Sequence, residues 1–159
     1  MTKEELIQLL KEYKENKARL NLRLKELKTK RIQLKACHEI ETSITASIGI
    51  NQDIHSKNKI SDKVARQVER NETRRQEIEE EIKVLEETVK ALRNKVEAVE
   101  DRLIGLKYKE REILVAYYID GRTAEDIGNK LYLDLFNQTR SIRHIQRIID
   151  RATDKLLNF

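Results

Sequence analysis

Three polar side chains near the C-terminus have the types and the spacing that suit recognition of double-stranded DNA. Arg143, Gln146 and Arg147 lie on one side of a predicted helix, opposite an apolar stripe. The stripe consists of residues that recur at spacings of three and four: Ile145, Ile148, Ile149, Ala152 and Leu156. An Arg side chain can bind guanine through two hydrogen bonds, and a Gln side chain can bind adenine in the same way. We therefore expect these three residues to contact base edges in the major groove.

Positive charge is concentrated around this helix, which favours contact with DNA phosphates. Residues 139–151 include four Arg residues and one acidic residue. The N-terminus of the helix, near Ser141, should attract phosphate through its backbone N–H groups and its dipole. The side chains expected to contact phosphate are Arg122, Lys130 and Arg140. The simpler alternative is that these Arg residues only form the solvated side of an amphipathic helix.

The segments before this helix carry signals that would position it. Asp120 and Gly121 predict the end of a preceding helix, with Gly in the left-handed conformation. Thr123 and Asp126 form a capping-box pattern that predicts the start of the next helix. Gly128 has no Cβ, so the recognition helix could cross close to it.

The stretch from Leu106 to Leu156 resembles region 4 of bacterial primary sigma factors, the helix-turn-helix that reads the promoter −35 element. Residues 106–114 are similar to the first core helix of that region, residues 123–128 to the second and residues 141–156 to the recognition helix. The resemblance implies that Ser141 caps the recognition helix. It also implies that four residues face the DNA: Ile142, Arg143, Gln146 and Arg147.

The chain departs from this family between Gly128 and the recognition helix. Sigma region 4 joins the two helices by a few residues, whereas here the connection is longer and includes residues 132–140. Thr139 and Ser141 are therefore both candidates for the N-cap. In overall layout, a long charged helical segment ahead of this domain, the chain resembles the ArpU/RinA-type sigma-like regulators of Gram-positive phages and mobile elements.

The first hundred residues predict two long helices that pair through apolar seams. A capping box of Thr2 and Glu5 predicts the start of the first helix, which should end near Thr42. Ser61 is the expected N-cap of the second helix. The seam of the second helix alternates steps of four and three over a long stretch: Ile78, Ile82, Leu85, Val89, Leu92, Val96, Val99, Leu103 and Leu106.

Two heptad helices joined by one loop, expected near residues 43–60, can fold back as an antiparallel hairpin. If the turn centres near Ile50, Asn71 and Arg75 come close to Leu27 and Arg31. We expect such a polar layer to fix the alignment of the two helices at some cost in stability.

Composition limits the alternatives. The chain of 159 residues has 38% charged residues and no Pro, which favours long helices. No stretch is apolar for long enough to cross a bilayer, and the single Cys37 cannot form an internal disulfide, so a cytoplasmic protein is expected. A net charge of +5 permits nucleic-acid binding without demanding it. No catalytic or metal-ligand constellation emerges, so neither an enzyme nor a metal or cofactor is expected.

The predicted architecture is all-α: a long antiparallel coiled-coil hairpin over residues 1–106, followed by a sigma-region-4-like helix-turn-helix domain over residues 107–159. The predicted function is sequence-specific binding of double-stranded DNA for transcription regulation. RNA polymerase and a second copy of the chain are further candidate partners. The alternative is an adaptor or anti-sigma-like protein that binds RNA polymerase through the coiled-coil arm, whose residues 77–87 are strongly acidic.

Overall fold

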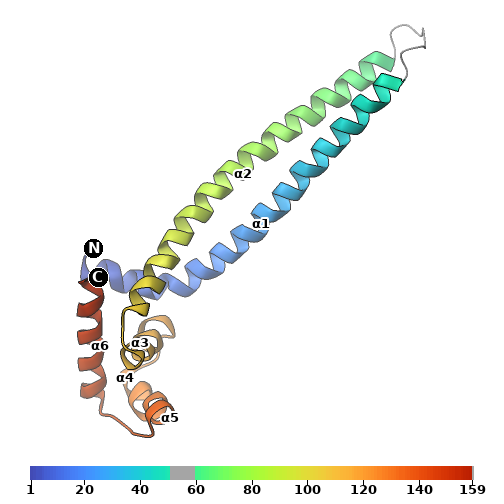
Figure 1. Cartoon of the computed structure of the whole chain (residues 1–159). Helices are drawn as coiled ribbons and strands as arrows, with labels where there is room; N and C mark the ends of the chain where they lie inside the picture. Colours follow the sequence, from blue (N-terminus) through green and yellow to red (C-terminus); the bar gives the residue numbers. More distant parts are fainter. Residues whose placement is uncertain (51–59, 159) are drawn as a thin grey trace. The chain divides into compact units, whose positions relative to one another are not determined.

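The computed structural model describes residues 1–50 and 60–158, and the side chains of residues 1–40 and 65–158. Within these residues the chain is helical and contains no strand, which confirms the predicted all-α class. Two long helices, α1 (Lys3–Ile50) and α2 (Ile60–Ile104), precede a set of shorter ones (Figure 1). The shorter elements are α3 (Tyr108–Leu114), η1 (Val115–Ile119), α4 (Ala124–Asp126), η2 (Ile127–Leu131), α5 (Tyr132–Phe136) and α6 (Ile142–Leu157).

The start of α1 is the capping box that the sequence predicts. The Glu5 N–H donates to Thr2 Oγ1 at 3.2 Å, and the Thr2 N–H donates to Glu5 Oε2 at 2.8 Å. These two hydrogen bonds satisfy backbone donors that have no partner within the helix.

The predicted loop at residues 43–60 is wrong at both of its ends. Helix α1 continues through residues 43–50, and α2 begins at Ile60, so Ser61 lies inside the helix instead of preceding it. Residues 51–59 of that loop lie outside the described residues. Ser, Thr and Gly cost only about 0.5 to 1 kcal/mol each in a helix relative to Ala, and a segment without Pro can absorb that cost.

The chain divides into two compact units, and their boundary differs from the expected one at residue 106. One unit combines Met1–Leu20 with Ala91–Phe159, and the other is Asn21–Lys90. The shorter C-terminal helices therefore share a unit with the beginning of α1 and the end of α2. Among the helices that the structure describes, none is long and apolar enough to cross a membrane.

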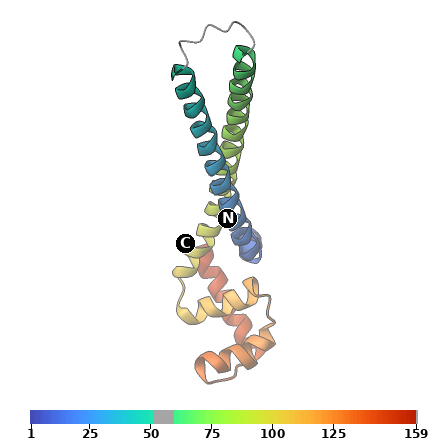
Figure 2. The same cartoon turned by 90° about the vertical axis from the view of Figure 1, so that its right-hand side faces the viewer.

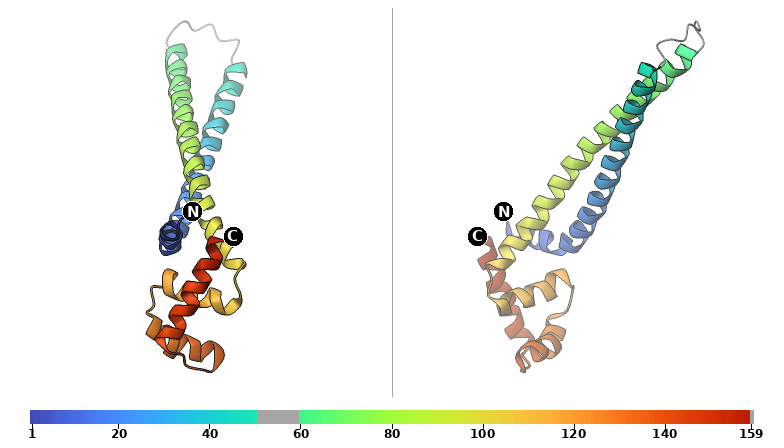
Figure 3. Two further views of the ribbon diagram at one scale, coloured as in Figure 1. Left: turned by 90° about the vertical axis from the view of Figure 1, so that its left-hand side faces the viewer. Right: turned by 45° about the vertical axis from the view of Figure 1, so that its right-hand side comes forward.

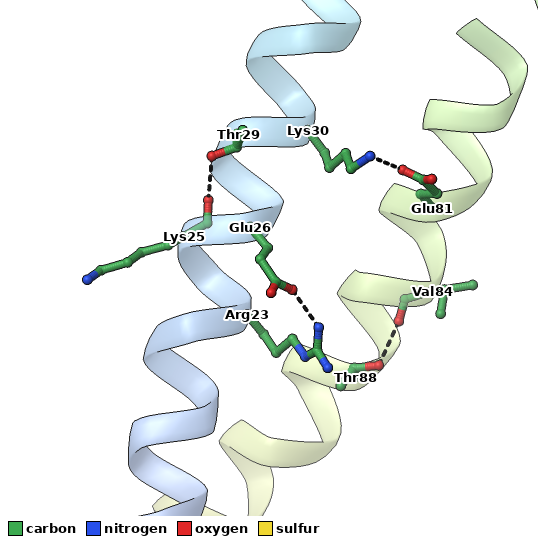
Figure 4. A network of polar contacts seen from close by, with 8 residues as sticks. All are labelled: Arg23, Lys25, Glu26, Thr29, Lys30, Glu81, Val84 and Thr88. Carbon is green, nitrogen blue, oxygen red and sulfur yellow. Dashed lines mark hydrogen bonds and ion pairs between the residues drawn. The ribbon is translucent and has the colours of Figure 1, made fainter. Parts of the chain in front are cut away.

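In the unit Asn21–Lys90, α1 and α2 lie side by side in opposite directions (Figures 1 and 3). Leu27 and Cys37 of α1 form a buried cluster with Ile78 and Ile82 of α2. Charged side chains beside this seam link the two helices. Lys30 pairs with Glu81 (Figure 4), and Arg31 Nη2 lies 2.7 Å from Glu86 Oε1.

These pairs show that the predicted polar layer is wrong in register. Arg31 faces Glu86 instead of Asn71 or Arg75, and Arg75 Nε lies 3.6 Å from Glu79 Oε1 within its own helix. The physical reason is the length of α1. Because α1 continues to Ile50 and α2 begins at Ile60, the connection is centred further along the chain than Ile50, and every facing pair shifts accordingly.

The unit formed by Met1–Leu20 and Ala91–Phe159 contains the larger hydrophobic core. Leu6 and Leu10 of α1 are buried there beside Val99 and Leu103 of α2 and the apolar faces of the C-terminal helices. Three lysines of α1 form ion pairs inside this unit, with Asp154, Asp120 and Glu100. The beginning of α1 is therefore part of the globular C-terminal unit and not only of the helical arm.

The C-terminal helices run in three segments. Helix α3 continues into η1, whose π-type hydrogen bonds include Asp120 N–H to Val115 O at 2.9 Å, and the helix ends before Gly121, with φ of +69° as the sequence predicts. The segments α4, η2 and α5 follow one another without a break up to Asn137, whose φ is +51°. The last segment, α6, packs across α3 (Figure 2).

Candidate nucleic-acid interface

The start of α6 is set by Ser141. Its backbone is extended, with φ of −66° and ψ of 152°, and its Oγ accepts a hydrogen bond from the His144 N–H at 3.4 Å. Ser141 is therefore the N-cap, and Thr139 is not. The longer connection noted in the sequence becomes additional helix up to Phe136, followed by Asn137 and a short link to Ser141.

Helix α6 has one deeply buried side. Ile145, Ala152, Thr153 and Leu156 each have 0% exposure. An α-helix turns by about 100° per residue, which places Arg143 and Arg147 about 140 to 180° around the helix from Ile145, Ala152 and Leu156. Both Arg residues are exposed, as are Ile142 and Gln146. The structure therefore presents to solvent all four α6 residues that the resemblance assigns to DNA.

The exposed Arg side chains have no carboxylate partner in the part of the chain that the structure describes. Neither Arg143 nor Arg147 forms an ion pair there. The acidic residues of α6, Asp150 and Asp154, lie in its later turns, and Asp154 Oδ1 is 3.1 Å from Lys3 Nζ. The first turns of α6 therefore carry positive charge with no acidic residue among them, whereas the later turns also contain carboxylates.

A group of cations and aromatic rings lies on the His144 side of α6. Lys109 Nζ is 4.4 Å from the ring centre of Tyr132 and 4.8 Å from that of Phe136, and Arg140 Cζ is 5.7 Å from the Tyr132 ring centre. Such cation–π contacts favour a fixed position for each cation. Burial would raise the pKa of Tyr132, but Lys109 and Arg140 outweigh burial and lower that pKa.

His144 lies in a region of positive charge. Its ring packs edge-on against Tyr132, with centroids 6.4 Å apart. Burial lowers the pKa of His144, and the charges of four cations lower it further: Arg140, Lys109, Arg147 and Arg151. The field that disfavours a protonated imidazole is the same field that would attract a phosphate.

The sequence analysis did not single out Lys109 as a candidate contact. The sequence feature that could have indicated it is the spacing of Tyr132 and Phe136. These rings are four residues apart and therefore share a helix face on which a cation can pack. The pairing of that face with α3 depends on how the two helices pack, which spacing within one helix does not specify.

The three residues predicted to contact phosphate differ in the side chains with which they now interact. Arg122 is exposed, and its side chain has no ion-pair partner within the described ranges. Lys130 Nζ lies 2.9 Å from Asp126 Oδ1, and both side chains are exposed. Arg140 Nη2 donates to Gln138 Oε1 at 2.6 Å. Exposed contacts of this kind are worth little in water, so Asp126 and Gln138 would not prevent Lys130 and Arg140 from contacting a phosphate.

In comparisons with known proteins, the chain matches no protein-family model, no curated protein and no solved structure.

Proposed function

We propose that this protein binds double-stranded DNA in a sequence-specific manner and regulates transcription, with α4 to α6 acting as a helix-turn-helix and α6 as the recognition helix. The observation that supports this proposal most strongly is the state of Arg143 and Arg147. Both are exposed on the first turns of α6, opposite its buried side, and neither is paired with a carboxylate among the described residues.

The surroundings of α6 suit entry into a major groove. An α-helix in that groove lies between two phosphate backbones. Arg122 lies on the Gln146 side of α6, where both residues line one shallow groove. Lys109 and Arg140 lie on the opposite side, where both contact the Tyr132 ring that packs against His144. Positive charge on both flanks of a helix matches the two strands that would border it.

Each residue then has an expected role. Arg143, Gln146 and Arg147 would contact base edges, and Ile142, which is 47% exposed, would contact a thymine methyl group. Phosphate contacts would come from Arg122, Lys130, Arg140 and the N-terminus of α6 at Ser141. The resemblance to sigma region 4 supports a promoter element as the target.

The arm supports a second candidate function, binding of a basic protein surface such as one on RNA polymerase. Glu77 and Glu80 line a groove of the unit Asn21–Lys90 together with Val84, which is 64% exposed. Neither carboxylate forms an ion pair with a described residue. Glu81, by contrast, pairs with Lys30 (Figure 4), so part of the acidic run serves to join the helices.

Selection of bound duplexes from a random pool tests the first function. We expect one preferred duplex and a steep fall of affinity with salt. Arg147→Ala should weaken binding to the preferred duplex by about 1 to 3 kcal/mol and relax its sequence preference. Arg93→Ala is the matched control, because Arg93 is exposed on α2 and has no ion-pair partner among the described residues. The absence of any enriched duplex would refute the proposal and leave the arm as the functional surface.

A further inference from the structure

A shallow groove on the Gln146 side of α6 brings the first helix of the chain next to the proposed reading surface. Helix α1 contributes Ile7 and Lys11, the segment before α4 contributes Arg122 and Thr123, and α6 contributes Gln146. All of these residues belong to the same compact unit. The groove is therefore continuous from α1 to a side chain that is expected to contact a base.

Lys11 differs from the neighbouring lysines of α1 because it forms no ion pair with a described residue. Lys3 Nζ lies 3.1 Å from Asp154, Lys14 Nζ lies 2.7 Å from Asp120, and Lys17 Nζ lies 2.8 Å from Glu100. In contrast, Lys11 forms no ion pair with any residue in the described parts of the chain.

The surroundings of Lys11 explain why its charge remains unneutralised. One helical turn later, Glu15 is the carboxylate that could pair with it, but Glu15 Oε1 lies 2.5 Å from Arg19 Nη2. Asp120, which precedes the glycine of the same groove, is paired with Lys14. Glu15 and Asp120 are thus already engaged, and Lys11 and Arg122 line one groove without an ion-pair partner among the described residues.

We propose that Lys11 and Arg122 together bind the phosphodiester backbone of DNA beside the base pairs that α6 reads, so that α1 forms part of the DNA-binding surface. This inference rests on the proposed function. The Lys11 ammonium and the Arg122 guanidinium would each donate hydrogen bonds to phosphate oxygens. Ile7, Tyr117 and Tyr118 line the groove and offer an apolar surface for the aliphatic stem of Lys11.

The chemistry of this contact distinguishes it from base reading. A phosphate contact carries no sequence information, so Lys11 should contribute equally to preferred and random duplexes of the same length. Each neutralised phosphate contributes about 0.9 to the slope of log affinity against log salt. Loss of one contact should therefore make the fall in affinity between about 50 and 200 mM salt roughly threefold smaller.

The test is the salt dependence of duplex binding by Lys11→Gln in the full chain, with the selected duplex and a scrambled one. We expect the slope to fall by about 1 on both duplexes and Lys11→Arg to restore it. Lys28→Gln is the matched control, because Lys28 is an exposed lysine of α1 in the other unit. Its slope should equal that of the wild type.

The outcomes separate this inference from the function on which it rests. If the wild type selects a duplex and Arg147→Ala relaxes that selection, but Lys11→Gln keeps the wild-type slope, the contact from α1 is refuted and the function stands. If the wild type selects no duplex, both are refuted. An equal fall of slope in Lys11→Gln and Lys28→Gln would also refute the contact, since it would reflect net charge alone.

Discussion

The backbones of Gly128 and Arg140 are in direct contact. The Arg140 N–H donates to the Gly128 carbonyl oxygen at 3.0 Å. A Cβ atom added to Gly128 would overlap the carbonyl oxygen of Arg140 and would also touch the side chain of Ile145. Because Arg140 immediately precedes the cap of α6, this approach fixes where the helix begins. The close crossing predicted for Gly128 is therefore made by the segment that leads into α6.

Gly128→Ala should destabilise the fold strongly, because the obstructing atom belongs to the backbone and cannot rotate away. We expect a loss of about 3 kcal/mol in the free energy of unfolding, at the upper end of overpacking costs. Gly121→Ala is the comparison. It has open space around the added Cβ and a positive φ, so strain alone should cost about 1 to 2 kcal/mol. Chemical denaturation measures both; equal losses would show that the contact with Arg140 is not the limiting one.

His144 should make duplex binding depend on pH. Burial and the surrounding cations hold the pKa of His144 below its ordinary value in the free protein. A bound phosphate would offset those charges and raise this pKa, so binding would take up a proton. Affinity should therefore rise as pH falls from about 8 to about 5.5. NMR titration of the imidazole and binding assays with His144→Gln check this, and a pH profile that the variant shares with the wild type would contradict it.

Asn16 should lower the stability of the unit that contains it. Its side chain is 5% exposed, and its Nδ2 has no hydrogen-bond partner among the described residues. A buried unsatisfied donor costs about 1 to 3 kcal/mol. Asn16→Leu should thus raise the free energy of unfolding by about 1 to 2 kcal/mol. The exposed Asn21→Leu should leave it nearly unchanged. A destabilised Asn16→Leu variant would show that the amide fixes the helix alignment at a net gain.

Glu100 should contribute stability that disappears in acid. Its Oε1 accepts hydrogen bonds from Lys17 Nζ at 2.8 Å and Tyr13 Oη at 2.6 Å, and these lower the pKa of Glu100. A carboxyl with a lowered pKa stabilises the folded state above its ordinary pKa and loses that effect as pH falls below about 4. Because the ion pair of Lys17 and Glu100 is largely exposed, Glu100→Gln should lower the free energy of unfolding by less than about 1 kcal/mol at pH 7. Thermal melts of both proteins should converge near pH 3, and a constant difference would contradict the assignment.

Local patterns in the sequence predicted the individual helices well. The capping residues Thr2 and Ser141 were recognisable because an N-cap is a local arrangement of a few residues. The apolar seam of α2 was also confirmed, with Ile78, Val89 and Val99 buried. Periodicity indicates which side of a helix is buried, whichever helix packs against that side. The caps and the seam of α2 could therefore be predicted without knowing the neighbouring helix.

Relations between helices could not be predicted in the same way. The register of α1 against α2 depends on where both helices end, and the weak helix propensity of residues 43–50 concealed that end. The seam of Leu6 and Leu10 fits any apolar partner, so nothing in its spacing indicated that these residues join the core around α6. The same limit hid Lys11 and Lys109, whose positions matter only through the helices that pack beside them.

The ion pair between Lys3 and Asp154, together with burial of Leu6 against the terminal core, has a consequence for the order of assembly during synthesis. A contact between Lys3 and Asp154 closes a very long loop and forms late. The helical arm can pair as soon as α2 leaves the ribosome, whereas the terminal unit must wait for the last turns of α6. A fragment starting at residue 107 would lack the leucines of α1 and would leave part of its core open to water.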